Sequence, residues 1–217
     1  MMFYIPKIRA QNRIGPHKGE IISILIGCLL GDAYGSNRSR EGVRFSFKQS
    51  SKNKEYLFMI YEFFNKNGYC TNNIPRKYIV KLKHNDDVKD FERYEFVTYT
   101  FRSFKYIYEM FYKKQKKVLH LEKIKEYLDE RALAHWIMDD GGYTGAGIRI
   151  ATNAFTLKEV MFLKELLEDK FKLKCTIQEI YIKDKWSIYI TKDSMTHLIS
   201  IIKPYMHPSM YYKLGIK

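Results

Sequence analysis

Two segments of nine residues constrain the fold of this chain more than any other feature of its sequence. Each is an apolar stretch with helical spacing that ends in aspartate: Leu25–Ala33 reads LIGCLLGDA, and Leu133–Gly141 reads LAHWIMDDG. The elements expected after the first segment return in the same order after the second. We therefore interpret the chain as a diverged tandem duplication, whose two halves face each other about a pseudo-two-fold axis.

Hydrophobic periodicity predicts the same elements in each half, namely a helix, a strand, a helix, two strands and a helix. In the first half they fall at residues 19–33, 43–49, 53–67, 74–83, 94–101 and 103–111. In the second half they fall at residues 127–140, 147–153, 156–171, 175–183, 186–191 and 194–203. The expected organisation is an irregular basic arm at 1–18, a first half at 19–112, a lysine-rich linker at 113–126 and a second half at 127–217.

The composition excludes several classes of protein. The chain has 217 residues, of which 46% are hydrophobic and 16% aromatic, so it can bury a core and is not disordered. Lys and Arg total 38 against 24 Asp and Glu, and the net charge of +14 favours a polyanionic partner. Three distant cysteines, Cys28, Cys70 and Cys175, favour a reducing compartment over a disulfide framework. The longest apolar run, Ile21–Gly31, falls short of the roughly 20 residues of a membrane span, so no membrane partner is expected.

Asp32 and Asp140 close the two predicted helices. Free carbonyls give a helix C-terminus partial negative charge, so a further carboxylate there is unfavourable unless a cation lies nearby. Gly27 and Gly31 share one face of the first helix and let a second backbone approach closely, with Ala134 as a small partner on the second helix. If the helices pack in parallel, the two acids emerge side by side, and hard cations such as Mg²⁺ would have to lie between them.

Such a metal site suits phosphodiester hydrolysis, because bound ions can activate water and stabilise the charge that develops on the phosphate. At these residues the chain resembles the LAGLIDADG homing endonucleases, specifically the single-chain members with two motifs. The two nine-residue segments occupy the motif positions, and the resemblance runs from about Ile21 to Lys213, through GDAY, MDDGG, IKPY and MYYKL.

The resemblance implies an α+β fold of two pseudo-symmetric αββαββα half-domains with saddle-shaped antiparallel sheets in the DNA major groove. It further implies a site-specific endonuclease that cuts both strands across the minor groove and leaves short 3′ overhangs. Mg²⁺ is the expected cofactor, Mn²⁺ is expected to substitute for it, and Ca²⁺ is expected to bind without supporting cleavage.

The resemblance also assigns roles to individual residues. A lysine from each half is expected near the scissile phosphates, and by position these are Lys117 and Lys213. Two residues depart from the family pattern. Ala33 replaces the final glycine of the first motif, and His135 replaces a small residue in the second, which predicts a looser helix crossing.

The metal ligands expected are the carboxylates of Asp32 and Asp140, with the backbone carbonyls of Gly31 and Asp139. By side-chain type alone, either Asp139 or Asp140 could supply the carboxylate. Alignment with Asp32 selects Asp140.

Strand alternation predicts which side chains reach DNA. Phe45 and Phe47 would face the core, which leaves Arg44, Ser46 and Lys48 for base edges. The same reasoning gives the further candidates Lys81, Lys83, Arg149, Asn153, Thr176 and Gln178. A strand of about ten residues covers about nine base pairs, so the two halves would read on the order of 18 base pairs, in an asymmetric site.

The residues leave rival functions open. An RNA maturase, which assists intron splicing and has intron RNA as its partner, would keep both acids for helix packing alone. A DNA-binding regulator with a degenerate site is a third candidate. The histidines His84, His120, His135, His197 and His207 show no zinc-ligand spacing and are assigned no catalysis.

We rank a monomeric, metal-dependent endonuclease acting on double-stranded DNA first, because both acids and both lysines are in place. Richness in Lys, Tyr, Ile and Asn is compatible with an AT-rich organellar genome, so the expected compartment is a mitochondrion or a chloroplast.

Overall fold

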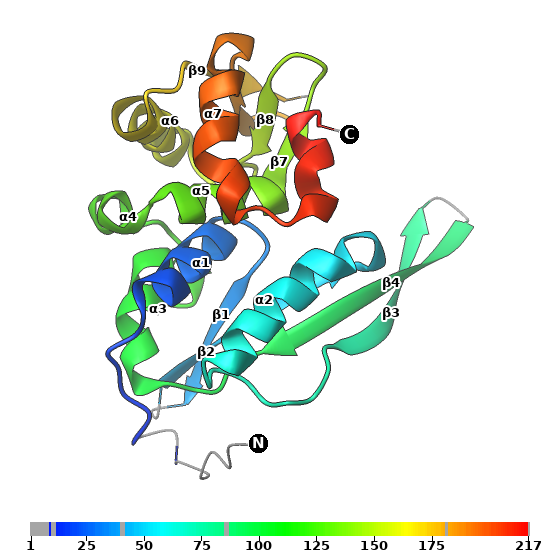
Figure 1. The fold of residues 1–217 in the computed structure, drawn as a ribbon, viewed down its shortest axis with the longest axis vertical. Coiled ribbons are helices and arrows are strands. Elements are labelled where there is room, and N and C mark those ends of the chain that lie inside the picture. The colour runs from blue at the N-terminus through cyan, green and yellow to red at the C-terminus, as the bar shows by residue number, and fades with distance from the viewer. Residues whose placement is uncertain (1–8, 10–11, 40–41, 85–86, 181, 217) are drawn as a thin grey trace. The chain divides into compact units, whose positions relative to one another are not determined.

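The computed structural model describes residues 9, 12–39, 42–84, 87–180 and 182–216, and these form two compact units (Figure 1). Unit 1 comprises Met1–His17 and Asp32–Tyr108, and unit 2 comprises Lys18–Gly31 and Glu109–Lys217. The first helix therefore belongs to the same unit as the second half of the chain. The reason is packing, because α1 (Gly19–Leu30) lies against α5 (Glu130–Asp140). The compact units thus differ at α1 from the halves expected from the repeat.

Unit 1 is built on a four-stranded antiparallel sheet with the strand order β1-β2-β4-β3. The strands are β1 (Tyr34–Ser39), β2 (Gly42–Ser50), β3 (Arg76–His84) and β4 (Asp87–Val97). Helix α2 (Lys54–Lys66) packs on β2 and β4, and α3 (Lys105–Phe111) follows the sheet in the chain.

An aromatic core joins the sheet of unit 1 to α2. Phe45, Phe47 and Phe96 alternate onto the covered face of the sheet and are buried. The rings of Phe47 and Phe96 stack with centroids 4.7 Å apart, and Phe64 of α2 meets Phe47 at 5.2 Å. The strand residues that alternate with these form what we call the open face of unit 1.

Part of the expected N-terminal arm is described, and it packs on unit 1. Arg13 Nη1 donates to the Thr100 carbonyl at 3.2 Å, and its guanidinium lies 4.7 Å from the centre of the Tyr99 ring. The two ring nitrogens of His17 lie 2.9 Å from the Tyr69 hydroxyl and 2.8 Å from Ser103 Oγ, and burial lowers the pKa of His17. Pro6 and Lys7 of the arm lie outside the described residues.

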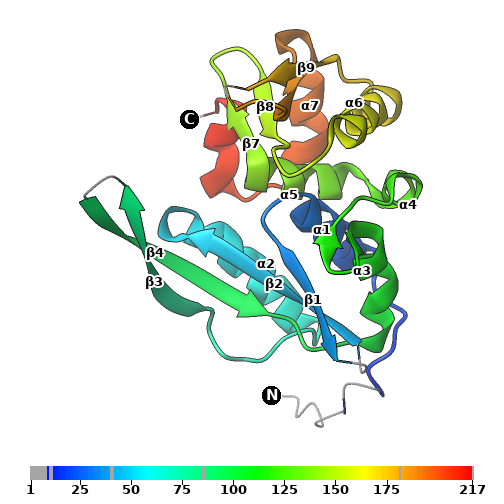
Figure 2. The same cartoon turned by 180° about the vertical axis from the view of Figure 1, so that it is seen from behind.

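Unit 2 contains a second four-stranded antiparallel sheet with the order β7-β8-β10-β9. Figure 2 labels its strands β7, β8 and β9. Its strands are β7 (Gly141–Tyr143), β8 (Ile148–Ala151), β9 (Cys175–Glu179) and β10 (Trp186–Ile190). Helix α6 (Leu157–Phe171) packs on β9 and β10 and begins with a capping box, in which Thr156 and Glu159 satisfy each other's backbone N–H groups. Helix α7 (Met195–Ile202) packs against α5.

The two sheets have the same strand order. The predicted α+β fold, with two αββαββα repeats that each contain an antiparallel sheet, is therefore confirmed. Two strands of that repeat, β1 and β7, were not predicted by periodicity. Their sequences, YGSNRS and GGY, are rich in glycine and polar residues, and both pair along a more hydrophobic neighbour.

Some element boundaries differ from the predictions. Residues 84–93, which separate the predicted strands 74–83 and 94–101, belong largely to the strands themselves, since β3 extends to His84 and β4 begins at Asp87. The lysine-rich segment at 113–126 is not a plain connector. It contains most of the hairpin of β5 (Tyr112–Lys113) and β6 (Lys116–Lys117) and most of helix α4 (Leu121–Tyr127). No helix in the described part of the chain is long and apolar enough to span a membrane.

Candidate active site

Helices α1 and α5 approach each other most closely at the two glycines of the first motif. A Cβ atom added to Gly27 would overlap the Ala132 carbonyl oxygen and lie 2.8 Å from His135 Cβ. One added to Gly31 would overlap Asp139 Cβ. The facing residues are therefore Ala132, His135 and Asp139 rather than the expected Ala134. The looser crossing predicted at His135 is wrong, because Gly27 lies opposite it and makes room for the imidazole.

His135 is a packing residue of this helix pair. It is 2% exposed, and its Nδ1 lies 3.8 Å from Cys28 Sγ on α1. Burial, with a smaller contribution from the nearby Arg131 charge, lowers the pKa of His135 to about 3. The imidazole is therefore neutral at physiological pH.

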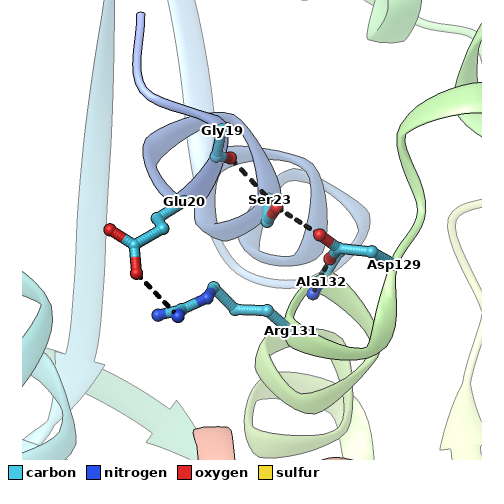
Figure 3. A network of polar contacts seen from close by, with 6 residues as sticks. All are labelled: Gly19, Glu20, Ser23, Asp129, Arg131 and Ala132. Carbon is cyan, nitrogen blue, oxygen red and sulfur yellow. Dashed lines mark hydrogen bonds and ion pairs between the residues drawn. The ribbon is translucent and has the colours of Figure 1, made fainter.

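A polar network holds the N-terminal ends of the two helices together (Figure 3). Asp129 caps α5 by accepting from the Ala132 N–H at 2.8 Å, and Ser23 Oγ of α1 lies 2.5 Å from the other Asp129 oxygen. Arg131 pairs with Glu20 at 2.8 Å. Because the N-termini meet here and the C-termini meet at Gly31 and Asp139, the helices run parallel, as predicted.

A lysine meets the last turn of each helix. Lys213 Nζ, in the 3-10 helix Pro208–Leu214, donates to the Asp139 carbonyl at 2.7 Å, and Lys213 is 7% exposed. Lys117 Nζ, at the end of β6, donates to the Gly31 carbonyl at 3.4 Å and lies 5.2 Å from the centre of the Phe155 ring. These ammonium groups offset the partial negative charge of two parallel helix ends.

Asp139 and Asp140 differ in their surroundings although both are half-buried. The Asp139 side chain occupies the space that a Cβ atom on Gly31, the C-cap of α1, would take, and the Asp139 carbonyl accepts from Lys213. Asp139 is therefore part of the helix packing. Consecutive helical residues point about 100° apart, so the carboxylate of Asp140 takes a different direction.

In unit 1, Asp32 lines a cavity of about 330 Å³. Gln49 Nε2 donates to Asp32 Oδ2 at 3.0 Å, and Asn53 Nδ2 donates to Gln49 Oε1 at 3.3 Å. Gln49 is 8% exposed, so a buried amide donates to the exposed carboxylate of Asp32. The cavity is lined by Asp32, Lys48, Gln49, Ser50, Asn53 and Arg93.

Gln49 was not among the predicted site residues. The available signal was its parity, because Gln49 shares the covered face of β2 with Phe45 and Phe47. A polar side chain on a core face requires a hydrogen-bonding partner, and here that partner is Asp32.

The predicted DNA-facing residues of unit 1 divide between the two faces of the sheet. Arg44, Ser46 and Lys48 lie on the open face. Lys81 pairs with Asp90, so its parity is that of the covered face, and the expectation that it shares a face with Arg44 is wrong. The sequence of β3, RKYIVKLKH, has no apolar alternation that would fix which of its side chains face the core. The side chain of Lys83 lies outside those described.

In unit 2 the predicted residues lie mostly together. Arg149, Thr176 and Gln178 share the sheet face opposite the buried Ile148, Ile150 and Ile188. Arg149 Nη2 donates to Gln178 Oε1 at 3.0 Å across the sheet. Asn153 is exposed in the turn after β8 rather than in a strand.

Comparison with known proteins agrees with this geometry. A model of the LAGLIDADG DNA endonuclease family matches residues 22–198. The chain belongs to the LAGLIDADG family. Among solved structures, this LAGLIDADG chain is similar to the homing endonuclease I-WcaI bound to its DNA recognition sequence, with a TM-score of 0.81, 26% identity and coverage of 98% of this chain and 95% of that one. The structure of I-DmoI in complex with DNA and Mn shares the fold, with a TM-score of 0.52 and 16% identity over 85% of this chain and 96% of that one.

Its curated relatives include proteins of two kinds. The cytochrome b mRNA maturase bI2 of Debaryomyces hansenii is 38% identical, over 92% of this chain and 75% of that protein. Its counterpart in Saccharomyces cerevisiae is 37% identical over 94% of this chain, which spans 49% of that longer protein. The probable intron-encoded endonuclease 1 of Wickerhamomyces canadensis is 29% identical over 88% of this chain and 81% of that protein.

The donor atoms at the helix ends of this LAGLIDADG chain fit a hard divalent cation. They are the Asp140 carboxylate and the carbonyl oxygens of Gly31 and Asp139, and oxygen ligands of this kind suit Mg²⁺, Mn²⁺ and Ca²⁺. Within the described residues, no group of three or more His, Cys, Asp or Glu side chains could hold a metal. A Mg²⁺ site that keeps several water ligands needs only one or two carboxylates.

Proposed function

We propose that the chain is a metal-dependent, site-specific DNA endonuclease in which Asp32 and Asp140 bind the divalent ions. The observation that carries the proposal is the parallel contact of α1 and α5 at Gly31 and Asp139. Asp32 and Asp140 are the next residues in the chain, and consecutive Cα atoms are about 3.8 Å apart. The backbone of each acid therefore lies one residue beyond the contact between Gly31 and Asp139.

In this proposal the carboxylates of Asp32 and Asp140 and the carbonyls of Gly31 and Asp139 hold the metal. A bound divalent ion supplies Lewis-acid chemistry, by lowering the pKa of water and neutralising charge on the phosphate. Gln49 keeps the Asp32 carboxylate oriented through the hydrogen bond at 3.0 Å. Mg²⁺ is the proposed cofactor, Mn²⁺ a substitute, and Ca²⁺ an ion that binds without supporting cleavage.

Lys117 and Lys213 are the proposed assisting residues. Their ammonium groups lie at the two carbonyls that would ligate the metal, which puts fixed positive charge beside the reacting phosphate. Charge fixed in a partly buried site stabilises a developing phosphate charge better than mobile ions do.

The proposed substrate is a duplex of about 18 base pairs read by the open faces of the two sheets, cut across the minor groove to leave 3′ overhangs. I-WcaI, solved on its DNA recognition sequence, supports a DNA substrate. The two sheets differ in sequence, so one chain would act as a monomer on an asymmetric site. The names of its relatives, which refer to introns and to cytochrome b mRNA, favour a mitochondrion as the compartment.

The test is a cleavage selection followed by single substitutions. Sites cut by the wild-type chain with Mg²⁺ are selected from a randomised duplex library, and the preferred site is assayed for cleavage and for binding. We expect Asp32→Asn and Asp140→Asn to lower the cleavage rate by about 10³-fold or more while binding persists, because several kcal/mol of metal stabilisation is lost. Asp139→Asn is the matched control, and it should retain cleavage because its carbonyl remains. Undiminished cleavage by either of the first two variants would overturn the proposal.

An RNA maturase is the second candidate, favoured by relatives at 38% and 37% identity that carry that name. The two functions separate in paired assays, namely cleavage of intron-lacking DNA and splicing of the intron-containing precursor RNA. Splicing activity that Asp32→Asn and Asp140→Asn both retain, with no DNA cleavage by the wild-type chain, would favour the maturase.

A further inference from the structure

The open face of unit 1 carries a carboxylate between two basic side chains. Glu95 of β4 lies directly opposite Lys48 of β2 on one side and Arg76 of β3 on the other. Lys48 Nζ is 3.7 Å from Glu95 Oε2, and Arg76 Nη2 is 3.9 Å from Glu95 Oε1. We call these three residues the Glu95 row, because they form one line across three neighbouring strands.

The ion pairs in the Glu95 row orient the side chains without hydrogen-bonding them to each other. Both N···O distances exceed the roughly 3.5 Å at which a hydrogen bond is lost. The side chains of Lys48 and Arg76 are 48% and 72% exposed and that of Glu95 is 20% exposed, and ion pairs whose cations are this exposed contribute little to folding stability. A contribution to folding stability therefore does not explain why these three residues are in line. Because they do not hydrogen-bond to each other, their donors and acceptors can bind a ligand.

The charges of the three side chains restrict the class of ligand that the row can bind. Of the strand side chains described on the open face of unit 1, Glu95 is the one carboxylate, whereas Asp90 and Glu92 have the opposite parity. A carboxylate on a surface that approaches DNA repels phosphates, so it opposes sequence-independent binding. It can instead accept a hydrogen bond from the N4 amino group of cytosine, while arginine and lysine donate to O6 and N7 of guanine.

We propose that the Glu95 row reads consecutive base pairs in the major groove, with Glu95 on a cytosine amino group and Lys48 and Arg76 on neighbouring guanines. The inference rests on the proposed function, since it requires duplex DNA on the open face of unit 1. Because the strands run along the duplex in the proposed function, the row crosses the groove, and its two strand separations of about 10 Å fit within the roughly 12 Å width of the major groove. Its side chains therefore reach one base pair and the pairs beside it. The row is therefore a specificity element for a block of about three base pairs rich in G·C.

The experiment compares Glu95→Gln with a matched variant of the same strand. Glu92 also pairs with a lysine, Lys77, at 2.6 Å, but on the opposite face of β4, so Glu92→Gln is the control. Wild type and both variants each select bound duplexes, without divalent metal, from a library that varies the preferred cleavage site one block at a time. The readout is the base preference at each position, with binding to unrelated duplex as the measure of sequence-independent affinity.

We expect Glu95→Gln to lose its preference for cytosine at one position by roughly 5- to 150-fold, the discrimination of one good base contact. The loss should be confined to a block of about three base pairs, and binding to unrelated duplex should be unchanged or tighter because a negative charge is gone. Arg76→Met should relax a position within the same block, and Glu92→Gln should keep the wild-type profile.

Two results would overturn the inference while leaving the proposed function intact. One is a Glu95→Gln profile identical to that of the wild-type chain. The other is the same relaxation in Glu92→Gln, which would mean that the removed charge matters and its place on the sheet does not. A wild-type chain that selects no duplex at all would overturn both proposals.

Discussion

Gly27 and Gly31 are the residues at which the smallest change of side chain has a large expected effect. At both positions the opposing helix occupies the volume of a methyl group, so any side chain must push α1 and α5 apart. Overpacking of this kind costs about 1–3 kcal/mol in well-packed interiors. The close packing of the helix pair therefore depends on having glycine at these two positions as much as on the apolar residues around them.

We expect Gly27→Ala to lower the free energy of unfolding by about 1–3 kcal/mol, because the new Cβ meets the Ala132 carbonyl and His135. Gly19→Ala in the same helix is the control, since nothing lies within 4 Å of a Cβ at Gly19. Urea unfolding at fixed pH measures both. Equal stabilities for the two variants would contradict the close packing at Gly27.

His135 should make the stability of the chain depend on pH in the acid range. Its pKa in the folded state is about 3 against 6.5 for an unperturbed histidine, so below pH 6.5 the unfolded chain binds a proton that the folded chain does not. This contribution is complete above pH 6.5 and is lost as pH falls toward 3, by at most about 1.4 kcal/mol per pH unit. Urea unfolding at a series of pH values should give a flatter profile for His135→Met than for the wild-type chain. Partial burial lowers the pKa of the half-buried His17 as well, so part of the slope should remain in the variant.

The orientation of a side chain could be predicted from the sequence where a single pattern determines it. The parity of β2 follows from two phenylalanines, and Arg44, Ser46 and Lys48 lie on the open face accordingly. The orientation of Lys81 could not be predicted, because strand β3 offers no clear apolar alternation from which to fix its parity. Gln49 was missed because its hydrogen bond to Asp32 links residues 17 apart in the chain, which no local pattern reports.

At the scale of elements, Asp129 is the N-cap residue at which α5 begins. The Asp129 carboxylate caps the helix at the Ala132 N–H and contacts Ser23 of α1, so one side chain both begins α5 and joins it to its neighbour. Helices α1 and α5 were predicted as a pair from the spacing of two glycines. The strands β1 and β7 were not, because their formation depends on pairing with β2 and β8 rather than on their own sequences.

We expect Asp129→Ala to lower the free energy of unfolding by about 1–2 kcal/mol, since an N-cap is lost together with the contact to Ser23. Asp169→Ala, on the exposed surface of α6, should change stability by less than about 0.5 kcal/mol. Thermal unfolding followed by circular dichroism measures the difference. A similar small effect for both variants would mean that the polar network in Figure 3 does not stabilise the helix pair.

At the scale of the whole molecule, the net charge of +14 makes salt the main control of affinity for DNA. If the chain contacts 6–10 phosphates, its affinity should fall by about 10³- to 10⁵-fold between 50 and 200 mM salt. Fluorescence anisotropy with a labelled duplex measures this slope. An affinity that is independent of salt would contradict an electrostatic interface, whatever the sequence preference.

The order of elements over the whole chain could be predicted from the repeat, but the compact units could not. The repeat gives each half its own first helix, whereas packing groups α1 with the second half. Periodicity reports which face of a helix is apolar, and α1 is apolar almost all round, with nine of its residues buried. The two glycines predicted α5 as a partner of α1, but they did not predict that α1 would be grouped with the second half of the chain rather than with its own.

The grouping of α1 with α5 has a consequence for synthesis of the chain on the ribosome. Ser23 and Asp129 meet in the folded protein but are 106 residues apart. At about 5–20 residues per second, the nascent α1 waits roughly 5–20 s for its partner to be translated. During that time an apolar helix is without the surface that later covers it, so chaperones that hold hydrophobic segments should engage this chain early, and ribosome stalling before α5 should promote aggregation.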